Sequence, residues 1–328
     1  MAACFMKWQS RTPFSALLPM RIGALLFAIL ICLLPQIVQG RELTSVGVIV
    51  ADLENPFFEQ LGRGVQDAAK RMIGPSVKVT VRSSGYDLDR QIKQIDTFIA
   101  EHVDLLVINA VDTQGIEAAV LRARAAGIIV VAVDVKASGA QATAMSDNRA
   151  AGTIACQYLA QRLGGKGDVL IVDGPPVSSV TERVSGCRTA LSIFPQIRIL
   201  PDDENCGGSL EGGLACMTDA LMKYPRLDAA FAINDPTAIG ANIAAARATR
   251  SEFFIVSVDG SPRGVEVLRQ ADTRLVATVT QRPWQMAEMA VTFGLALFAG
   301  KPVSDNLIQI PVDLLTRNNI ANYTDWGR

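Results

Sequence analysis

Histidine is almost absent from this sequence: the chain of 328 residues has one, His102. A single imidazole cannot supply a histidine-rich metal centre, and the cysteines lack the spacing typical of metal ligands. Charge of one sign is also lacking, because the formal net charge is -1 at pH 7 and no basic stripe occurs. That balance argues against nucleic acid as a partner. We therefore expect no metal, no cofactor and no nucleic acid.

An apolar run covers residues 22–38, follows Arg21 and ends just before the small residue Gly40. This arrangement predicts a secretory signal over residues 1–40 that is cleaved after Gly40, so that the protein is exported. A membrane anchor is the alternative interpretation. The run is shorter than the roughly 20 residues that a spanning helix needs, and Pro35 lies in its last turn, so we favour the signal.

Linkers rich in glycine, serine and proline are missing as well, although the length predicts two domains. Apolar strand patterns alternate with helical patterns, which indicates parallel sheets with helices on both faces. The fold class is therefore α/β. The predicted strands form two sets with a later tail, at 45–51, 77–82, 104–109 and 128–133, at 168–172, 197–201, 228–232, 253–258 and 275–280, and at 307–312.

The tail after the second set returns to the first, which explains why no simple linker occurs. We expect two doubly wound parallel-sheet lobes joined by a three-stranded hinge, with a ligand cleft between them. The predicted ranges are residues 41–146 plus 282–310 for the N-terminal lobe, 147–281 plus 311–328 for the C-terminal lobe, and 145–147, 281–283 and 311–315 for the hinge.

The two halves repeat a pair of polar residues at predicted strand ends. Asn109 precedes Asp134 by 25 residues (134 minus 109), and Asn234 precedes Asp259 by 25 residues (259 minus 234). Open α/β sheets bind ligands at the carboxyl ends of their strands. Two such edges facing each other make a cleft suited to a small molecule. Singly, each aspartate reads as an ordinary turn residue; as equally spaced pairs they indicate a site.

Asn55, Pro56, Phe57 and Phe58 stand at a corner between a predicted strand and a predicted helix. Asn55 suits the N-cap of that helix, and Pro56 suits its first turn. With this corner and other short motifs, nearly all of the chain after residue 40 resembles the ribose-type periplasmic sugar-binding proteins. The motifs are Glu54 to Phe58, Ile108-Asn109, Asp134, Ser146-Asp147-Asn148, Glu182-Arg183, Ile233-Asn234-Asp235, Val258-Asp259-Gly260 and Thr280-Gln281.

The resemblance implies a solute-binding protein that captures a monosaccharide or sugar alcohol and delivers it to the inner-membrane permease of an ABC importer. It implies no enzymatic activity, and we expect a monomer. Aromatic rings would cover the C–H faces of the sugar, while planar polar groups would pair with its hydroxyls. By resemblance, the ligand-binding residues are Asn55, Phe57, Phe58, Asn109, Asp134, Arg183, Asn234, Asp259 and Gln281.

Several alternatives stay open at this point. The chain could serve a chemoreceptor or sensor kinase, or it could be a glycoside-acting enzyme that uses paired carboxylates. Phe58 could belong to the core, and Arg183 could be a charge on a helix surface. The sequence also departs from the family pattern: Val135 stands where an arginine often follows the first aspartate, and the third aromatic position falls near Gly208. Both departures place ribose itself in doubt.

Loss of the signal would leave Cys156, Cys187, Cys206 and Cys216 in the exported chain, where disulfides form. Cys187 lies one turn beyond Arg183, and Cys206 follows the strand at 197–201. In a doubly wound sheet both can reach one corner. We therefore expect a Cys187–Cys206 disulfide, with Cys156 and Cys216 free and buried.

Overall fold

The computed structural model describes residues 42–201, 204–303, 305–324 and 326. The predicted signal segment, residues 1–40, lies outside the described residues. Residues 43–328 form one compact unit. Among the described residues, no helix combines the length and the apolar character needed to cross a bilayer.

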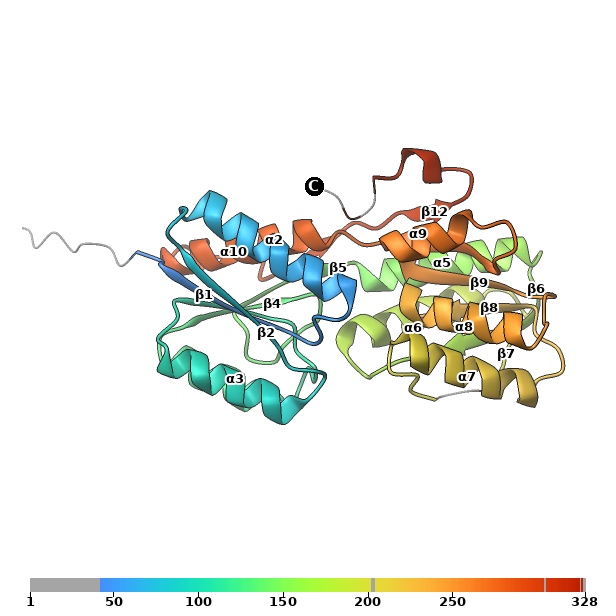
Figure 1. Cartoon of the computed structure of the whole chain (residues 1–328), viewed down its shortest axis with the longest axis horizontal. Helices are drawn as coiled ribbons and strands as arrows, with labels where there is room; N and C mark the ends of the chain where they lie inside the picture. Colours follow the sequence, from blue (N-terminus) through green and yellow to red (C-terminus); the bar gives the residue numbers. More distant parts are fainter. Residues whose placement is uncertain (1–41, 202–203, 304, 325, 327–328) are drawn as a thin grey trace, which may run out of the picture. The chain divides into compact units, whose positions relative to one another are not determined.

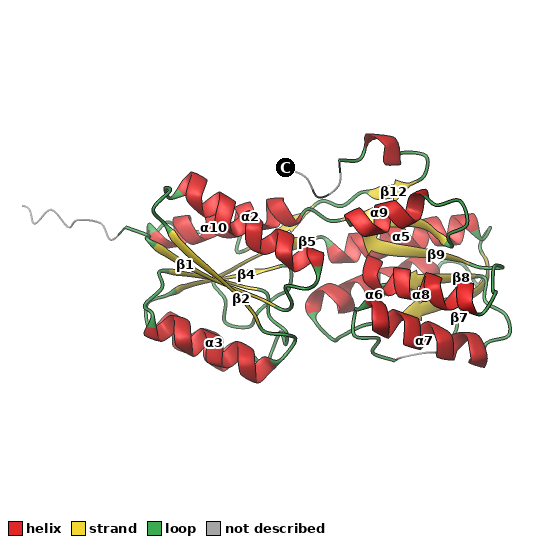
Figure 2. Cartoon of the chain, in the orientation of Figure 1, coloured by secondary structure: helices red, strands yellow, loops and turns green. Residues whose placement is uncertain are grey.

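The unit contains two six-stranded sheets, each in its own lobe (Figures 1 and 2). The first sheet has the order β11-β5-β4-β3-β1-β2, and all of its pairings are parallel. Its strands are β1 (Ser45–Val50), β2 (Lys78–Ser83), β3 (Leu105–Ile108), β4 (Ile129–Val133), β5 (Ala142–Ser146) and β11 (Leu307–Ile310).

The second sheet has the order β12-β10-β9-β8-β6-β7, and β12 alone runs antiparallel, beside β10. Both sheets therefore match the expected doubly wound α/β class. The strands of the second sheet are β6 (Lys166–Val172), β7 (Gln196–Ile199), β8 (Ala229–Ala232), β9 (Phe254–Asp259), β10 (Leu275–Thr280) and β12 (Leu314–Thr316).

Helices cover both faces of each sheet (Figure 2). The helices of the first lobe are α2 (Pro56–Met72), α3 (Leu88–Ala100), α4 (Glu117–Ala125) and α10 (Pro283–Phe298). The helices of the second lobe are α5 (Asn148–Arg162), α6 (Ser178–Leu191), α7 (Leu210–Lys223), α8 (Asp235–Arg247) and α9 (Pro262–Arg269), followed by the 3-10 helix η1 (Ile320–Asn322).

Strand β1 shows why the strands of these sheets are apolar along most of their length. Val46, Val48 and Val50 pack into the core beneath α2 and α10, whereas Ile49 packs into the core beneath α3. Successive side chains of a strand point to opposite faces, so a strand covered on both sides buries every residue. The same covering turns the carboxyl ends of the strands into the open edge of each lobe.

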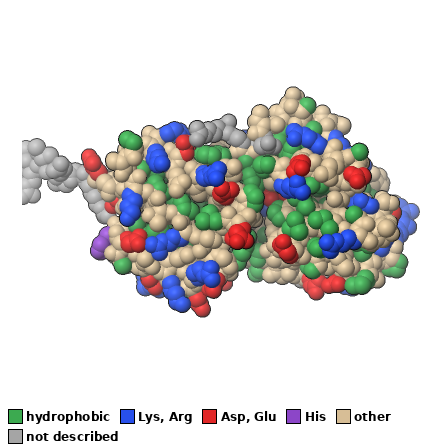
Figure 3. Space-filling view, viewed as in Figure 1, with side chains coloured by type: hydrophobic (Ala, Val, Ile, Leu, Met, Phe, Trp, Pro, Cys, Tyr) green, Lys and Arg blue, Asp and Glu red, His purple; other side chains and the backbone are tan. Residues whose placement is uncertain are grey.

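The chain passes between the lobes three times, after β5, after β10, and between β11 and β12. The last two passages let α10 and β11 complete the first lobe after the second has been built. On the face drawn in Figure 3, side chains of both charge signs are interspersed over both lobes, in keeping with the net charge of -1.

Candidate functional site

A cavity of about 80 Å³ lies where the strand ends of the two lobes meet. A single water needs about 10–15 Å³, so the space suits a small molecule. All of the residues predicted from the sequence to bind ligand line this cavity: Asn55, Phe57, Phe58, Asn109, Asp134, Arg183, Asn234, Asp259 and Gln281. Whether each contacts a ligand stays a prediction.

The first lobe contributes a hydrogen-bonded pair at the ends of β3 and β4. The Asn109 carboxamide accepts a bond from the Ala51 amide at 3.1 Å and donates one to Asp134 Oδ2 at 2.9 Å. The other carboxyl oxygen of Asp134, Oδ1, makes no hydrogen bond within the described part of the chain. Asp134 is buried and lines the cavity, so this oxygen is an acceptor available to a ligand hydroxyl.

The apolar wall comes from the start of α2. Asn55 caps the helix, since its side-chain oxygen accepts a bond from the Phe57 amide at 3.0 Å. The Phe57 and Phe58 rings meet edge to face at 5.4 Å, and Phe58 contacts Tyr86 in the same way at 6.3 Å. Both phenylalanines belong to the core of the first lobe and also line the cavity. The two rings are therefore part of the core and part of the cavity wall at the same time.

Arg183 carries the positive charge of the site, and the alternative that it is a surface charge is wrong. Its side chain is only 5% exposed. Its Nε donates to Asn148 Oδ1 at 2.8 Å, and its Nη1 donates to the Ile233 carbonyl at 2.9 Å. The same Nη1 lies 3.9 Å from Asp259 Oδ1. These bonds fix the guanidinium before any ligand arrives.

The approach of α5 to α6 brings Asn148 within reach of Arg183. A Cβ at Gly152 on α5 would lie 1.9 Å from the Arg183 carbonyl oxygen, far closer than two atoms can come. Glycine at this position is therefore required for the two helices to touch beside the site.

Asp259 uses both of its carboxyl oxygens within the protein. Oδ1 accepts from Gln281 Nε2 at 2.7 Å, and Oδ2 accepts from the Asp235 amide at 3.2 Å. Gln281 in turn accepts from the Ser146 hydroxyl at 2.9 Å, where the chain leaves β5. Asp259 is thus connected to the crossing segments between the lobes.

Beneath Asp259 lies a second buried carboxyl, Asp235, which we did not select as a site residue from the sequence. It accepts from the hydroxyls of Ser257 at 2.5 Å, Thr278 at 2.7 Å and Ser261 at 2.8 Å. The motif Ile233-Asn234-Asp235 contributed to the family resemblance, but from the sequence we assigned Asp235 no role of its own. The three hydroxyls come from different segments, so only the folded chain brings them together.

Asn234 occupies the N-cap of α8 rather than bonding to its aspartate partner. Its Oδ1 accepts from the Thr237 amide at 2.9 Å, and its Nδ2 donates to the Gly208 carbonyl at 2.8 Å. Gly207 and Gly208 both line the cavity with φ of 67° and 68°. Glycine adopts this left-handed conformation readily. Asn234 therefore holds this glycine loop at the wall of the cavity.

Burial dominates the protonation of the two cleft aspartates. It raises the pKa of Asp134 to about 6, against the opposing effects of Arg183 and of the bond from Asn109. Burial, with the repulsion from Asp235, raises the pKa of Asp259 to about 8, and Arg183 opposes this shift. The pKa of Asp235 is also raised by burial, against its hydroxyl donors.

Two contacts join the lobes next to residues that line the cavity. Lys136 Nζ lies 2.6 Å from Glu182 Oε1, and the Lys136 amide donates to Ser178 Oγ at 2.8 Å. The lobes are therefore closed on each other. Sequence reasoning missed Lys136 because nothing local indicates that the loop after β4 meets α6.

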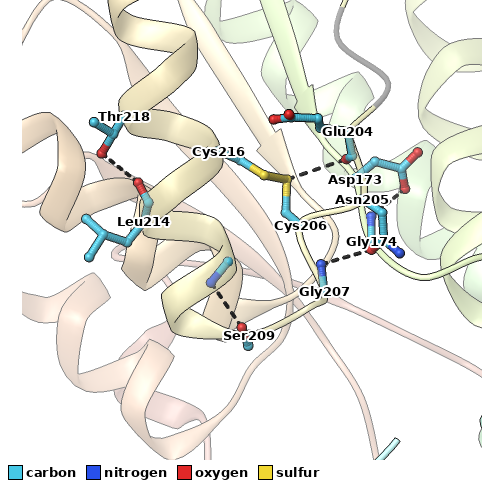
Figure 4. Close-up of a disulfide and its surroundings, with 11 residues drawn as sticks. Asp173, Gly174, Glu204, Asn205, Cys206, Gly207, Ser209, Leu214, Cys216 and Thr218 are labelled. Carbon is cyan, nitrogen blue, oxygen red and sulfur yellow. Dashed lines mark hydrogen bonds between the residues drawn. A yellow bond between two sulfur atoms is a disulfide. The ribbon is translucent and has the colours of Figure 1, made fainter. Parts of the chain in front are cut away.

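The predicted Cys187–Cys206 disulfide is wrong. The disulfides are Cys156–Cys187, which joins α5 to α6, and Cys206–Cys216, which joins a loop to α7 (Figure 4). Cys156 and Cys187 belong to the core on one face of the second sheet, and Cys206 and Cys216 pack into the core on the other face. The sheet stands between Cys187 and Cys206. The prediction placed Cys206 on the wrong face.

The Cys206–Cys216 disulfide lies next to the glycine loop. Figure 4 shows the disulfide between Cys206 and Cys216 next to Gly207, with Ser209 as the N-cap of α7. The Gly207 amide donates to Asn205 Oδ1 at 2.9 Å, and the Ser209 hydroxyl accepts from the Gly212 amide at 3.0 Å. The loop that faces the cavity is therefore held at both ends.

No group of three or more histidine, cysteine or acidic side chains could hold a metal ion in the described portion of the chain. The polar groups of the cavity are amides, carboxyls, a guanidinium and hydroxyls. Such a set recognises hydroxyls, because it combines acceptors with donors beside an apolar wall.

Comparison with known proteins assigns this architecture. The family described as periplasmic binding protein domain matches residues 46–302. The chain is 30% identical over 276 residues to the ribose import binding protein of Bacillus subtilis, covering 83% of this chain and 87% of that protein. It is 25% identical over 285 residues to the xylitol-binding protein of Mycolicibacterium smegmatis, covering 86% of this chain and 79% of that protein.

A solved structure agrees. The ABC transporter solute-binding protein from Agrobacterium vitis, with bound allitol, matches with a TM-score of 0.78 at 25% identity. The match covers 86% of this chain and 98% of that structure. The resemblance inferred from the sequence motifs is thereby confirmed.

Proposed function

The chain belongs to the periplasmic binding protein domain family, and we propose that it captures a monosaccharide or sugar alcohol in the periplasm and delivers it to the permease of an ABC importer. The relatives named above are binding proteins for sugars and polyols, not enzymes. The observation that carries the proposal is the closed cavity, which sets charged and amide groups from both lobes against two phenylalanine rings.

A polyhydroxylated ligand fits the chemistry of these walls. Asp134 Oδ1 accepts from one ligand hydroxyl, and Arg183, already fixed by Asn148, donates to an adjacent one. The Phe57 and Phe58 rings cover the C–H faces. A ligand that lacks a hydroxyl at one of these places leaves a buried charged group unpaired, which costs about 1–3 kcal/mol or more. This penalty supplies specificity.

Capture requires the lobes to open and close. We assign the two moving bodies as residues 41–146 plus 282–310 and residues 147–281 plus 311–328, with the three crossings as the hinge. The contacts of Lys136 with Glu182 and Ser178 would break on opening and re-form around the ligand. Hinge motion at a few terminal positions of strands and helices is the usual way such lobes close.

Because the ligand is delivered to the permease, the permease is the protein partner. We expect a monomer in solution that binds one ligand per chain. Residues 1–40 would be removed on export. N-terminal sequencing of periplasmic protein should begin at Arg41; a mature chain that retains residues 22–38 would contradict this.

The experiment that tests the function uses residues 41–328 and a panel of pentoses, hexoses and polyols that includes ribose, xylitol, allitol and myo-inositol. A thermal-shift screen should find a stabilising ligand, and calorimetry should give one site per chain. The ligand should be recovered unaltered after long incubation. A panel without any stabilising member, or a chemically altered ligand, would overturn the proposal.

A further inference from the structure

The chain after β12 stays attached to the second lobe. Arg317 donates to the carbonyls of Leu268 at 2.8 Å and Gln270 at 2.6 Å. Ile320 packs into the core of the same lobe. The Tyr323 hydroxyl donates to the Gly260 carbonyl at 2.8 Å. This C-terminal segment therefore follows the second lobe to the residue next to Asp259.

Trp326 then connects that lobe to the first. Its indole Nε1 donates to the Asp259 carbonyl at 2.8 Å, in the second lobe. Its ring meets Phe57 edge to face, with centroids 5.6 Å apart and planes at 78°, and it belongs to the core cluster of the first lobe. The residue is 4% exposed. One side chain therefore contacts a residue of the proposed ligand site in each lobe.

The contact with Asp259 bears on the orientation of its carboxyl group. Asp259 has φ of 139°, a backbone conformation that side-chain-bearing residues adopt only when their surroundings impose it. The hydrogen bond from Trp326 holds the carbonyl of that residue. The contact with Phe57, in turn, supports the ring that covers one wall of the cavity.

We propose that Trp326 is a positioning residue of the ligand site, which orients Asp259 and Phe57 together and holds the lobes closed around a bound sugar or polyol. This inference rests on the proposed function. Opening the lobes separates Phe57 from Asp259, so Trp326 can satisfy both contacts only in the closed form. Its loss should therefore accelerate ligand release more than it slows association.

The chain offers a matched control and a built-in probe. Of its three tryptophans, Trp8 falls in the predicted signal, which leaves Trp284 and Trp326 in residues 41–328. Trp284 donates to Gln60 Oε1 at 3.1 Å, inside the first lobe and outside the cavity lining. In a Trp284→Phe chain, emission should shift to shorter wavelength when the ligand closes the lobes, because Trp326 becomes buried.

The test measures ligand release by stopped flow with the best sugar or polyol from the panel. Trp326→Ala should raise the dissociation rate about 10- to 100-fold, since it removes a hydrogen bond and an aromatic contact. Trp326→Phe retains a ring but no donor, so its rate should lie between those of Trp326→Ala and the native chain. Trp284→Phe should stay within about threefold of the native rate, because no contact of the cavity changes.

The outcomes separate this inference from the function on which it rests. A native chain that binds no member of the panel overturns both. A native chain that binds, with Trp326→Ala releasing ligand at the native rate, overturns only the role of Trp326. So does a Trp326→Phe chain that loses melting temperature without ligand yet keeps native release, since that result marks a residue needed for folding alone.

Discussion

The two halves of the molecule place the same residue pair at the same spacing and then use it differently. In the first half, Asn109 donates to Asp134 at 2.9 Å. In the second half, Asn234 donates to the Gly208 carbonyl instead, and Asp259 is held by Gln281 and by the Asp235 amide. An internal repeat in sequence has thus become two different sites in the fold.

The start of the next helix explains the difference. Asn234 follows β8 closely and is the N-cap of α8, so its side-chain oxygen is committed to the Thr237 amide. Asn109 follows β3, but α4 begins only at Glu117. Because Asn109 does not cap a helix, its side chain is able to donate to Asp134. Equal spacing in the chain therefore does not predict equal hydrogen bonding.

The consequence is a division of labour between the aspartates. Asp134 retains an oxygen without a hydrogen bond in the described chain, whereas both oxygens of Asp259 are paired internally. Loss of Asp259 should damage stability and binding together. Loss of Asp134 should damage binding far more than stability.

The largest effect is expected for Asp259→Ala. It leaves the Gln281 amide and the Asp235 amide without their acceptor, at about 1–3 kcal/mol each, and relief of the repulsion with Asp235 offsets part of this cost. We expect unfolding in denaturant to show a loss of about 2–4 kcal/mol, and calorimetry to show affinity at least about 100-fold weaker. Asp96→Ala, at an exposed ion pair with Arg122 away from the hinge, is the control. If Asp259→Ala is as stable as the native chain, the proposed difference between Asp259 and Asp134 is wrong.

A smaller effect should follow Asp134→Ala. A hydrogen bond to a charged group is worth about 1.5–3 kcal/mol, so ligand affinity should fall about 10- to 100-fold. Stability should change by only about 1 kcal/mol, since one amide, from Asn109, loses its partner. Asp134→Asn keeps the shape and removes the charge. If Asp134→Ala unfolds as readily as Asp259→Ala, the two sites are equivalent and the comparison fails.

The smallest effect is the pH dependence of binding. A ligand hydroxyl that donates to the Asp134 carboxylate favours its ionised form and lowers its pKa from about 6. The resulting affinity is fully present above pH 6 and declines as pH falls, by at most about tenfold per unit. Titration calorimetry between pH 5 and 8 measures it, with Asp134→Asn as the control. An equally steep profile in that variant would assign the effect to another group.

The stability of the ligand-free protein should change with pH in the opposite direction from the ligand affinity. Because burial raises the pKa of Asp134 in the folded state, its favourable contribution is present at low pH and is lost as pH rises through about 6. Asp259, with a pKa of about 8, extends this loss to higher pH. The same carboxyls therefore weaken the empty protein under the conditions in which they strengthen binding.

Much of the fold could be predicted because the strands are buried on both faces and read as apolar runs. Strands β5 and β12 were not predicted as strands. Ala142 to Ser146 is short and weakly apolar, and Leu314 to Thr316 has three residues. Strand β12 pairs with β10 and β5 pairs with β11, which are distant in sequence, although β5 also pairs with β4 just before it. Local pattern carries little information about such strands.

The residues of the candidate site also differ in whether the sequence alone could identify them. Residues in strand-end motifs, such as Asn109 and Asp259, could be selected from sequence because the edge of a parallel sheet gathers them. Asp235, Lys136 and Trp326 could not, since their partners lie on segments that only packing brings together. The prediction of the disulfide pairing was wrong for a related reason: sequence does not say on which face of the sheet the loop around Cys206 runs.

The late return of the chain to the first lobe sets an order of assembly. Helix α10 packs beside α2 against the first sheet, and β11 completes the edge of that sheet, yet both lie beyond residue 282. The segment that closes both disulfides, residues 156–216, is finished well before them. During synthesis, the lobe that begins first must therefore be the last to hide its core. Its exposed valines and phenylalanines would need protection until the chain is almost complete.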